Sequence, residues 1–360
     1  MKVQLSKYLC ILFLIPSLVL ANNNWKGKYT KEKKINKEFD VSADAALKIS
    51  NSYGNLSVTS WNQNKVVIEV HIMTNGNNEE KVQKKLDQID VDFEASRSLV
   101  QAKTIFNKSR TSSWWGSKKN NVNMKINYTI KVPVTNSVDL NNDYGHINLD
   151  KIEGDAKISC DYGRLIIGEL LSNNNILSFD YTRKSTIEYM RGGKISADYS
   201  GFEIDRAGNL TISADYTDST VKDGKDIKYS ADYGSLNIGK ANSVSGSGDY
   251  ITTRLGSISG DVDITADYGS LRIEQLTGNA GNVTIRADYT GIKIGYAPDY
   301  HFNFEVRLEY ASMRGGDDFD YKIKRSNSGD KYYQGHYGSA GSGKNISITA
   351  DYGGVTFFKS

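Results

Sequence analysis

The sequence predicts an all-β protein, a parallel β-solenoid (or β-helix) of about 17–21 residues per coil, with an N-terminal β insertion that carries one helix. Two observations lead to this fold class. An Asp-Tyr pair recurs at nearly constant spacing along the chain, and apolar residues stand at alternate positions around each copy. A period this regular is typical of stacked copies of one small structural unit, and the alternation is typical of strands.

The regular copies of the Asp-Tyr pair follow one another in steps of 18, 19, 18, 17, 17, 17, 18 and 21 residues. Their first residues are Asp143, Asp161, Asp180, Asp198, Asp215, Asp232, Asp249, Asp267 and Asp288. Related copies stand at Ser52-Tyr53, Glu309-Tyr310 and Asp351-Tyr352. No apolar-Gly sub-period of six residues occurs, which disfavours the left-handed hexapeptide type of solenoid.

Each repeat is expected to form two short strands joined by a bend. With the Asp as position zero, positions −3 and −1 are mostly apolar or small, and Tyr fills +1. These three positions share one parity, so we expect all three side chains to point into the core while the Asp faces outward. Gly often fills +2, where a bend favours a residue without a Cβ, and +4 and +6 are apolar.

We interpret the Asp-Tyr pairs as a structural ladder. The Asp would accept hydrogen bonds from backbone N–H groups at the bend, and the Tyr would form a stacked wall of the core. The alternatives are a carboxylate track that binds cations and a Tyr platform that binds a ligand. Stacked carboxylates repel by only about 0.9 kcal/mol per pair at ~4.8 Å in water, so no cation is required. The ladder residues are Asp161, Tyr162, Asp198, Tyr199, Asp215, Tyr216, Asp232, Tyr233, Asp267, Tyr268, Asp288 and Tyr289.

Residues 1–21 have the pattern of a secretory signal peptide. Lys2 and Lys7 precede an apolar stretch that ends in the small-residue cleavage site Val19-Leu20-Ala21. This stretch is too short to span a membrane and is interrupted by Pro16. We therefore expect an exported chain with no transmembrane span and no anchor, located in the periplasm, at the cell surface or outside the cell.

The composition excludes several classes of function. Without Lys2 and Lys7 the 45 basic residues become 43 (45 minus 2) against 42 acidic residues, so no nucleic-acid binding is expected. Beyond the signal peptide the one cysteine is Cys160, whose −1 position predicts a core thiol rather than a disulfide. The four histidines share no metal-site spacing, and no nucleophile or phosphate-loop motif occurs. We predict no catalytic residues, no metal and no cofactor.

Two segments interrupt the period. Residues 22–138 are expected to form an N-terminal coil and a β insertion that caps the open end of the solenoid, with a helix at Asn78–Asp90. The regular solenoid would span 139–295. Residues 296–345 are expected to form an irregular strand followed by a Gly/Ser-rich loop or hairpin, and 346–360 would form the final coil.

Trp114 and Trp115 stand in a polar, basic loop, NKSRTSSWWGSKKNN, at residues 107–121. Two adjacent tryptophans in such a loop need a partner surface. They would either fold back on the flank of the solenoid or form a contact tip for a polysaccharide, a membrane interface or another protein. We retain both residues as ligand-binding candidates.

The segments NSYGNLSVTSWN, NDYGHINLD and ADYGGVTF, together with the paired-Trp loop, resemble a bacterial family of putative adhesins. That family is related to the head GIN domain group of Bacteroidetes envelope proteins. The resemblance covers nearly all of the chain after the signal peptide. It implies a β-solenoid fold, an exported or envelope location and no established catalytic residues.

Together these observations predict a non-enzymatic scaffold for adhesion or interaction in the bacterial cell envelope. Its partner would be an envelope polysaccharide or protein, and the chain is expected to be a monomer. The alternatives are a carbohydrate-active enzyme on a β-helix and a periplasmic sensor or stress-response partner protein. The short coils at 143–294 leave little room for the long catalytic loops that such an enzyme would need.

Overall fold

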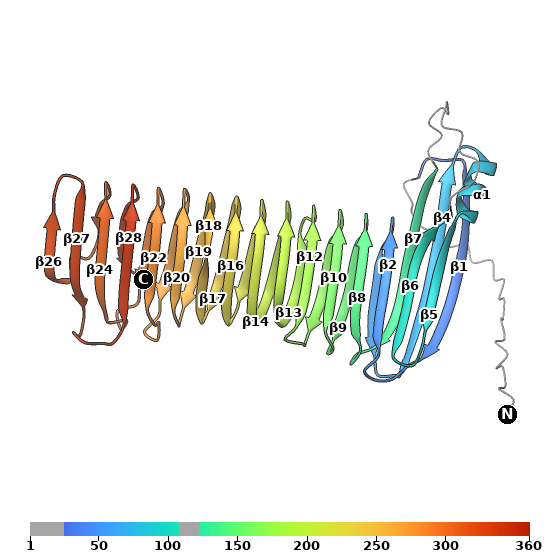
Figure 1. The fold of residues 1–360 in the computed structure, drawn as a ribbon, viewed down its shortest axis with the longest axis horizontal. Coiled ribbons are helices and arrows are strands. Elements are labelled where there is room, and N and C mark those ends of the chain that lie inside the picture. Colours follow the sequence, from blue (N-terminus) through green and yellow to red (C-terminus); the bar gives the residue numbers. More distant parts are fainter. Residues whose placement is uncertain (1–24, 108–121) are drawn as a thin grey trace.

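The computed structural model describes residues 25–107 and 122–360. Within these ranges the protein is all-β, with one α-helix and a single mixed sheet of 29 strands. Figure 1 shows the strands side by side along the long axis of the molecule, with the N-terminal strands at one end and β24 to β27 at the other. The predicted signal peptide, Trp114 and Trp115 lie outside the described residues.

The N-terminal elements precede the regular repeats. They are β1 (Tyr29–Asp40), β2 (Ala46–Ser52), β3 (Leu56–Trp61), β4 (Lys65–Gly76), α1 (Glu79–Asp87), β5 (Ile89–Ala95), β6 (Leu99–Phe106) and β7 (Asn123–Pro133). The helix begins where the sequence places it: Asn78 caps it by accepting the backbone N–H of Lys81 over 2.9 Å, and Val82 and Leu86 are buried.

The repeats supply most of the strands. They are β8 (Ser137–Asp143), β9 (His146–Ile152), β10 (Ala156–Asp161), β11 (Arg164–Leu170), β12 (Asn175–Asp180), β13 (Ser185–Asp198), β14 (Gly201–Asp215), β15 (Asp218–Asp223), β16 (Asp226–Asp232), β17 (Gly234–Ala241), β18 (Ser243–Asp249), β19 (Ile251–Ile258), β20 (Val262–Asp267), β21 (Ser270–Leu276), β22 (Val283–Asp288) and β23 (Gly291–Tyr296).

The C-terminal elements are β24 (Phe302–Glu309), β25 (Met313–Arg314), β26 (Asp320–Ser326), β27 (Asp330–Tyr337), β28 (Asn345–Asp351) and β29 (Val355–Lys359). The segment that the sequence interprets as a Gly/Ser-rich loop or hairpin contains the antiparallel pair β26–β27, and β27 also pairs antiparallel with β24.

Each repeat has a leading strand that ends at its Asp and a trailing strand that follows its Tyr. Leading strands pair in parallel with leading strands, and trailing strands with trailing strands, in strict register. Ile158 of β10, for example, lies beside Leu140 of β8 and Leu177 of β12. β13 and β14 each contain a trailing strand that continues into the next leading strand. Equivalent positions of all repeats therefore form straight rows along the molecule.

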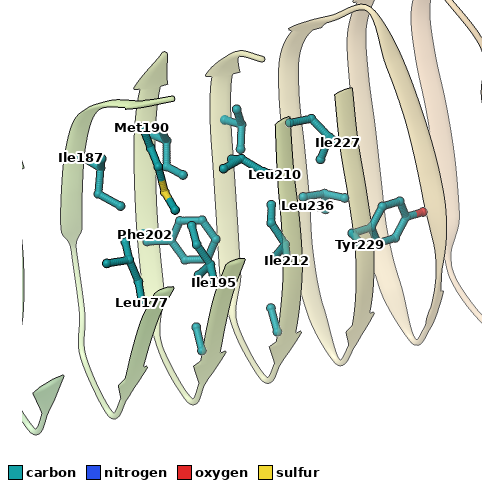
Figure 2. Close-up of a cluster of buried hydrophobic side chains, with 14 of the residues drawn as sticks. Leu177, Ile187, Met190, Ile195, Phe202, Leu210, Ile212, Ile227, Tyr229 and Leu236 are labelled. Carbon is teal, nitrogen blue, oxygen red and sulfur yellow. The ribbon is translucent and has the colours of Figure 1, made fainter. Parts of the chain in front are cut away.

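The core lies between the leading and trailing strands. Positions −3 and −1 of the leading strands are buried, as at Ile158 and Cys160, and so are +4 and +6 of the trailing strands, as at Leu271 and Ile273. Figure 2 shows such side chains from neighbouring repeats packed together. Phe179 of β12 meets Phe202 of β14 edge to face with ring centroids 5.7 Å apart. The alternation predicted these positions correctly, and Cys160 is a buried free thiol, as expected.

One core position combines a large and a missing side chain. The −3 row contains Tyr229 in β16, and the neighbouring repeat has Gly246 at the same position. A Cβ on Gly246 would lie 2.5 Å from Cδ1 of Tyr229, well inside contact distance. The buried Tyr229 ring, visible in Figure 2, is therefore accommodated by the absence of a side chain in the next repeat.

The order of repeats in space differs from the order in sequence at both ends. β2 and β3 pair in parallel with β8 and β9, while the intervening segment forms the antiparallel pairs β1–β4, β4–β7 and β5–β6. At the other end, β28 lies between β22 and β24. The last repeat of the chain thus lies between two earlier segments.

Replacing Gly246 by Ala is expected to lower the free energy of unfolding by roughly 1–3 kcal/mol, because the new methyl group overpacks the Tyr229 ring. Urea unfolding followed by circular dichroism measures the change. The matched control is Gly291→Ala, where a Cβ would meet nothing within 4 Å. That variant should remain within about 0.5 kcal/mol of wild type. Equal losses in the two variants would contradict this account of Gly246.

Candidate functional site

The tyrosines of the Asp-Tyr pairs lie on the surface, which corrects the prediction that they form a core wall. Tyr162, Tyr199, Tyr216, Tyr268 and Tyr289 are each 50–52% exposed. Tyr233 is slightly less exposed and Tyr310 slightly more. The predicted parity places −3 and −1 correctly but fails at +1.

The physical reason is the backbone conformation at the Tyr. Each leading strand ends at the Asp, and the Tyr that follows adopts the left-handed region, with φ between 48° and 66° along the ladder. Alternation of side chains applies only within an extended strand, so the turn reverses the direction of the Tyr side chain. A non-Gly residue in this region costs roughly 1–2 kcal/mol, so interactions elsewhere must offset that cost at every repeat.

Backbone hydrogen bonds hold the turn in place. The Tyr162 N–H donates to the carbonyl of Asp180 in the next repeat over 3.0 Å, and the Tyr216 N–H donates to that of Asp232 over 2.9 Å. The parallel pairing between repeats therefore continues through the turn. This bonding stabilises the strained conformation in every copy.

The glycine at +2 has a different role from the one predicted. The positive φ belongs to the Tyr, while Gly163 and its equivalents lack a Cβ because two chains approach closely. A Cβ on Gly163 would lie 1.9 Å from the carbonyl oxygen of Gly145 in the preceding repeat. Where +2 is not Gly, a buried hydroxyl can fill it: Thr217 donates to the carbonyls of Ala197 and Asp215.

The exposed rings form one continuous stack. Along the regular repeats neighbouring ring centroids lie 4.7–5.2 Å apart, with interplanar angles of 2–10°. The stack continues from Tyr53 onto Tyr144 at one end, and through Tyr289, Tyr352 and Tyr310 at the other. We call this row of rings the Tyr ladder. Inside it each ring covers the faces of its neighbours, so a ligand would meet ring edges and hydroxyl groups.

Stacking also affects the phenol groups. Partial removal from water, followed by the neighbouring tyrosines, raises the pKa of Tyr162, Tyr233, Tyr268 and Tyr352 above the ordinary 10.0. The ladder thus presents neutral hydroxyls, which can both donate and accept hydrogen bonds, across the physiological pH range.

The Asp carboxylates bond to the adjacent repeat. Oδ1 of Asp161 accepts the backbone N–H of Asp180, and Oδ1 of Asp215 and Asp267 accept those of Asp232 and Asp288, over 3.0–3.3 Å. Partial burial and the neighbouring carboxylates raise the pKa of Asp288. Equivalent contacts link Asp180 to Asp198 and Asp232 to Asp249. Among the described residues, no group of three or more His, Cys, Asp or Glu side chains is arranged to hold a metal ion.

A groove runs beside the Tyr ladder. It has a volume of about 970 Å³ and extends over three repeats. Tyr181, Tyr199 and Tyr216 form one wall. The floor includes Gly201 and Asp218 at position +3, and the opposite wall is the +5 row, here Thr186, Glu203 and Thr220. Arg183 and Lys184 also line it.

The same rows border two further hollows near the C-terminal end. One is bounded by Tyr310 and Tyr352 and the other by the +5 row, and the two share Ser312 and Gly354 at the floor. The sequence reasoning did not identify this groove. Its signal was present in the small residues at +3, such as Gly201, Ser270 and Gly291, which leave space beside a bulky +1 residue.

The remaining candidates lie elsewhere or outside the described residues. Trp114 and Trp115 are in the segment 108–121, about which the structure gives no information. Across residues 25–107 and 122–360, the structure contains no helix with the length and apolar character needed to cross a membrane.

Comparison with known proteins yields only distant likenesses. No family model and no curated protein matches the chain. Solved structures similar to it include a putative adhesin from Parabacteroides merdae, with 10% identity and a TM-score of 0.35 over 91% of this chain and 96% of that one. Another putative adhesin, from Parabacteroides distasonis, has 9% identity and a TM-score of 0.32 over 91% and 97% of the two chains.

A structure described as a putative lipid binding protein from Parabacteroides distasonis has 10% identity and a TM-score of 0.27 over 92% of this chain and 98% of that one. At such values a likeness does not establish an activity for this chain. The structures found are described as adhesion or binding proteins rather than enzymes, and the adhesins among them are the class that the sequence resemblance names. The link to the head GIN domain group stays a prediction.

The left-handed turn gives a direct stability test. Tyr216→Gly is expected to be more stable than Tyr216→Ala by about 1 kcal/mol, because both lose the stacked ring but only Gly adopts positive φ without strain. Both variants should be less stable than Tyr216→Phe, which keeps the ring stacked on Tyr199 and Tyr233. Chemical unfolding of the three variants measures the order.

The control is the same substitution pair at Thr220, in the middle of β15. There Gly should be the less stable by roughly 0.5–1 kcal/mol, because a strand gains nothing from positive φ and loses backbone entropy. If Ala exceeds Gly at both positions, the left-handed conformation of the Tyr is not what limits stability at the turn.

The raised pKa values predict a loss of stability at alkaline pH. The folded protein keeps its phenol protons to higher pH than the unfolded chain, whose tyrosines titrate near 10.0. The stabilisation is therefore complete below about pH 10 and declines as the pH rises through the folded values. Buried Tyr128, whose pKa burial raises to about 12, acts with the same sign.

Phenolate absorbance and unfolding midpoints between about pH 9 and pH 12 measure this effect. The double variant Y233F/Y268F should show a smaller alkaline loss than wild type, since it removes two of the shifted groups. Ladder tyrosines that ionise at their ordinary pKa in the folded protein would refute the prediction.

Proposed function

We propose that the chain is an exported, non-enzymatic β-solenoid that serves as an adhesion or interaction scaffold in the bacterial cell envelope, where the groove beside the Tyr ladder binds an extended polysaccharide. The single observation that carries the proposal is this groove, which follows the long axis over several repeats and has an uninterrupted row of Tyr hydroxyls on one side. An opening of this form suits a linear polymer better than a compact small molecule.

In-register parallel pairing of successive leading strands, and of successive trailing strands, supports the solenoid architecture. The antiparallel strands and helix of residues 22–138 would cap one end, and β26 and β27 would cover the other, between the regular repeats and solvent. Capping of this kind protects open sheet edges from association with other chains, in keeping with a monomer.

The signal-peptide pattern of residues 1–21 supports export, to the periplasm or the cell surface. Sugar hydroxyls suit the groove chemically, because the Tyr hydroxyls and those of Thr186 and Thr220 can donate and accept hydrogen bonds. The charged groups Arg183, Lys184 and Glu203 could orient a polymer along the groove.

The enzyme alternative rests on two carboxylates, Glu203 and Asp218, which line the same groove. Both are engaged by neighbours: Glu203 pairs with the ammonium group of Lys222, and Oδ1 of Asp218 accepts the Ser235 hydroxyl over 2.7 Å. A glycosidase needs one carboxyl group to act as an acid and the other as a nucleophile or base. Engagement in structural contacts favours binding over that chemistry. A periplasmic sensor or stress-response partner protein is the remaining alternative.

Blocking the groove tests the proposal. In Gly201→Trp the indole would fill the groove floor without backbone strain, because a Cβ there meets its nearest atoms only at 3.8 Å and the φ is not positive. We expect the variant to keep its melting temperature and to lose about tenfold or more in affinity for extracted envelope polysaccharides, measured with the chain that lacks the signal peptide.

The matched control is Thr265→Trp, which adds the same side chain at an exposed position of β20 outside the groove. It should bind as wild type does. The double variant W114S/W115S tests whether the loop at 107–121 contributes a second contact. Binding that survives Gly201→Trp but disappears in W114S/W115S would move the site to the loop, and polysaccharide cleavage by the wild-type chain would favour the enzyme alternative.

A further inference from the structure

The groove changes its charge along its length. The +5 row that forms one wall passes from Glu203 through Thr220 and Asn237 to Arg254. Arg254 then lies beside Arg272, and Arg272 beside Lys293. The next positions are Thr356 of the inserted last repeat and Arg314 of β25. We call Arg254, Arg272, Lys293 and Arg314 the basic wall.

The basic wall encloses a hollow. All four residues line a space of about 500 Å³, whose floor consists of small residues, among them Ser270, Gly291, Ser312 and Gly354. Thr356 lies in the wall between Lys293 and Arg314. The floor continues into the hollow beside Tyr310 and Tyr352, so the basic wall and the Tyr ladder border opposite sides of one space.

Only part of this positive charge is compensated. Nη2 of Arg272 donates to Oε2 of Glu274 over 2.7 Å, and its guanidinium group lies over the Phe358 ring. The guanidinium groups of Arg272 and, more weakly, Arg254 lower the pKa of Glu274. Within residues 25–107 and 122–360, no acidic side chain forms an ion pair with Arg254, Lys293 or Arg314.

The fold does not require this arrangement. Equivalent positions of the row are filled by Thr186, Glu203, Thr220 and Asn237 in the preceding repeats, so neutral or acidic residues fit the strand equally well. Adjacent cations at the strand spacing of about 4.8 Å repel one another. A row of like charges that the architecture does not need indicates a ligand that compensates them.

We propose that the basic wall binds the carboxylates of a linear acidic polysaccharide, a polyuronate, that lies along the groove. Arginine presents a planar, bidentate donor pair that matches a carboxylate, and the strand register places such donors at regular intervals along one line. The hydroxyls of Ser270, Ser312 and Thr356 lie in the same hollow and complement those of sugar rings. This inference rests on the proposed function and specifies its ligand.

A nucleic acid fits the same observations less well. The chain beyond the predicted signal peptide is nearly neutral, and the basic wall is confined to one end of the groove, whereas nucleic-acid proteins carry extended basic surfaces. The Gly and Ser floor allows a sugar ring to approach the backbone closely, without aromatic faces on which bases could stack.

Calorimetry with oligogalacturonate at low salt tests the proposal with the chain that lacks only residues 1–21. The triple variant R254Q/K293Q/R314Q leaves the Arg272–Glu274 pair intact. It is expected to bind at least about tenfold more weakly, because each lost exposed ion pair should weaken binding about two- to fivefold. Methyl-esterified oligogalacturonate should bind wild type as weakly as the acid form binds the triple variant, and added salt should weaken only the acid form.

The matched control K48Q/K194Q/K240Q removes the same number of exposed strand lysines away from the basic wall, and its affinity should stay within about twofold of wild type. Equal affinity of the triple variant and wild type, or no binding of the acid form, overturns the proposal. Tighter binding of inorganic polyphosphate, lost in the same variant, overturns the polyuronate assignment. If the envelope polysaccharides still bind in a Gly201→Trp-sensitive manner, the scaffold function stands without this ligand; if they do not, both proposals fail.

Discussion

In-register backbone pairing between neighbouring repeats is the constraint on which the rest of the structure depends. It places equivalent residues one strand spacing apart, about 4.8 Å, in every row along the molecule. The same spacing allows the Tyr rings to stack at 4.7–5.2 Å, keeps the Asp carboxylates within reach of the next backbone N–H, and aligns the basic wall. A single geometric period therefore builds a core, an aromatic ladder and a charged row at once.

Sequence reasoning succeeds where this period acts through extended strands. Alternation identifies the buried positions −3, −1, +4 and +6, and helical spacing finds α1. It fails at the Tyr, because the same residue that completes the repeat motif also leaves the strand for the left-handed region, and no pattern of apolar residues records that change. The predicted core wall is for this reason an exposed ladder.

The groove and its basic wall were beyond sequence reasoning for a related reason. Each depends on residues that are far apart in the chain and become neighbours only through register. Arg314 belongs to the same row as Lys293 because Thr356 of the last repeat lies between them. The spacing of Glu309-Tyr310 and Asp351-Tyr352 along the chain does not reveal that their order in space is reversed, with Tyr352 stacked between Tyr289 and Tyr310.

This reversed order has a consequence for how the chain matures. Most repeats pair with the one just synthesised, which closes a loop of about 20 residues, a small entropic cost. β24 instead needs β28, the penultimate strand, as its parallel neighbour, so its place in the stack stays undefined until nearly the whole polypeptide has emerged. Folding that proceeds from the N-terminus during export must wait at this end for the final residues. A truncation of the last fifteen or so would expose β22, β23 and β24 together, whereas loss of a terminal coil from a simple linear stack exposes only one repeat.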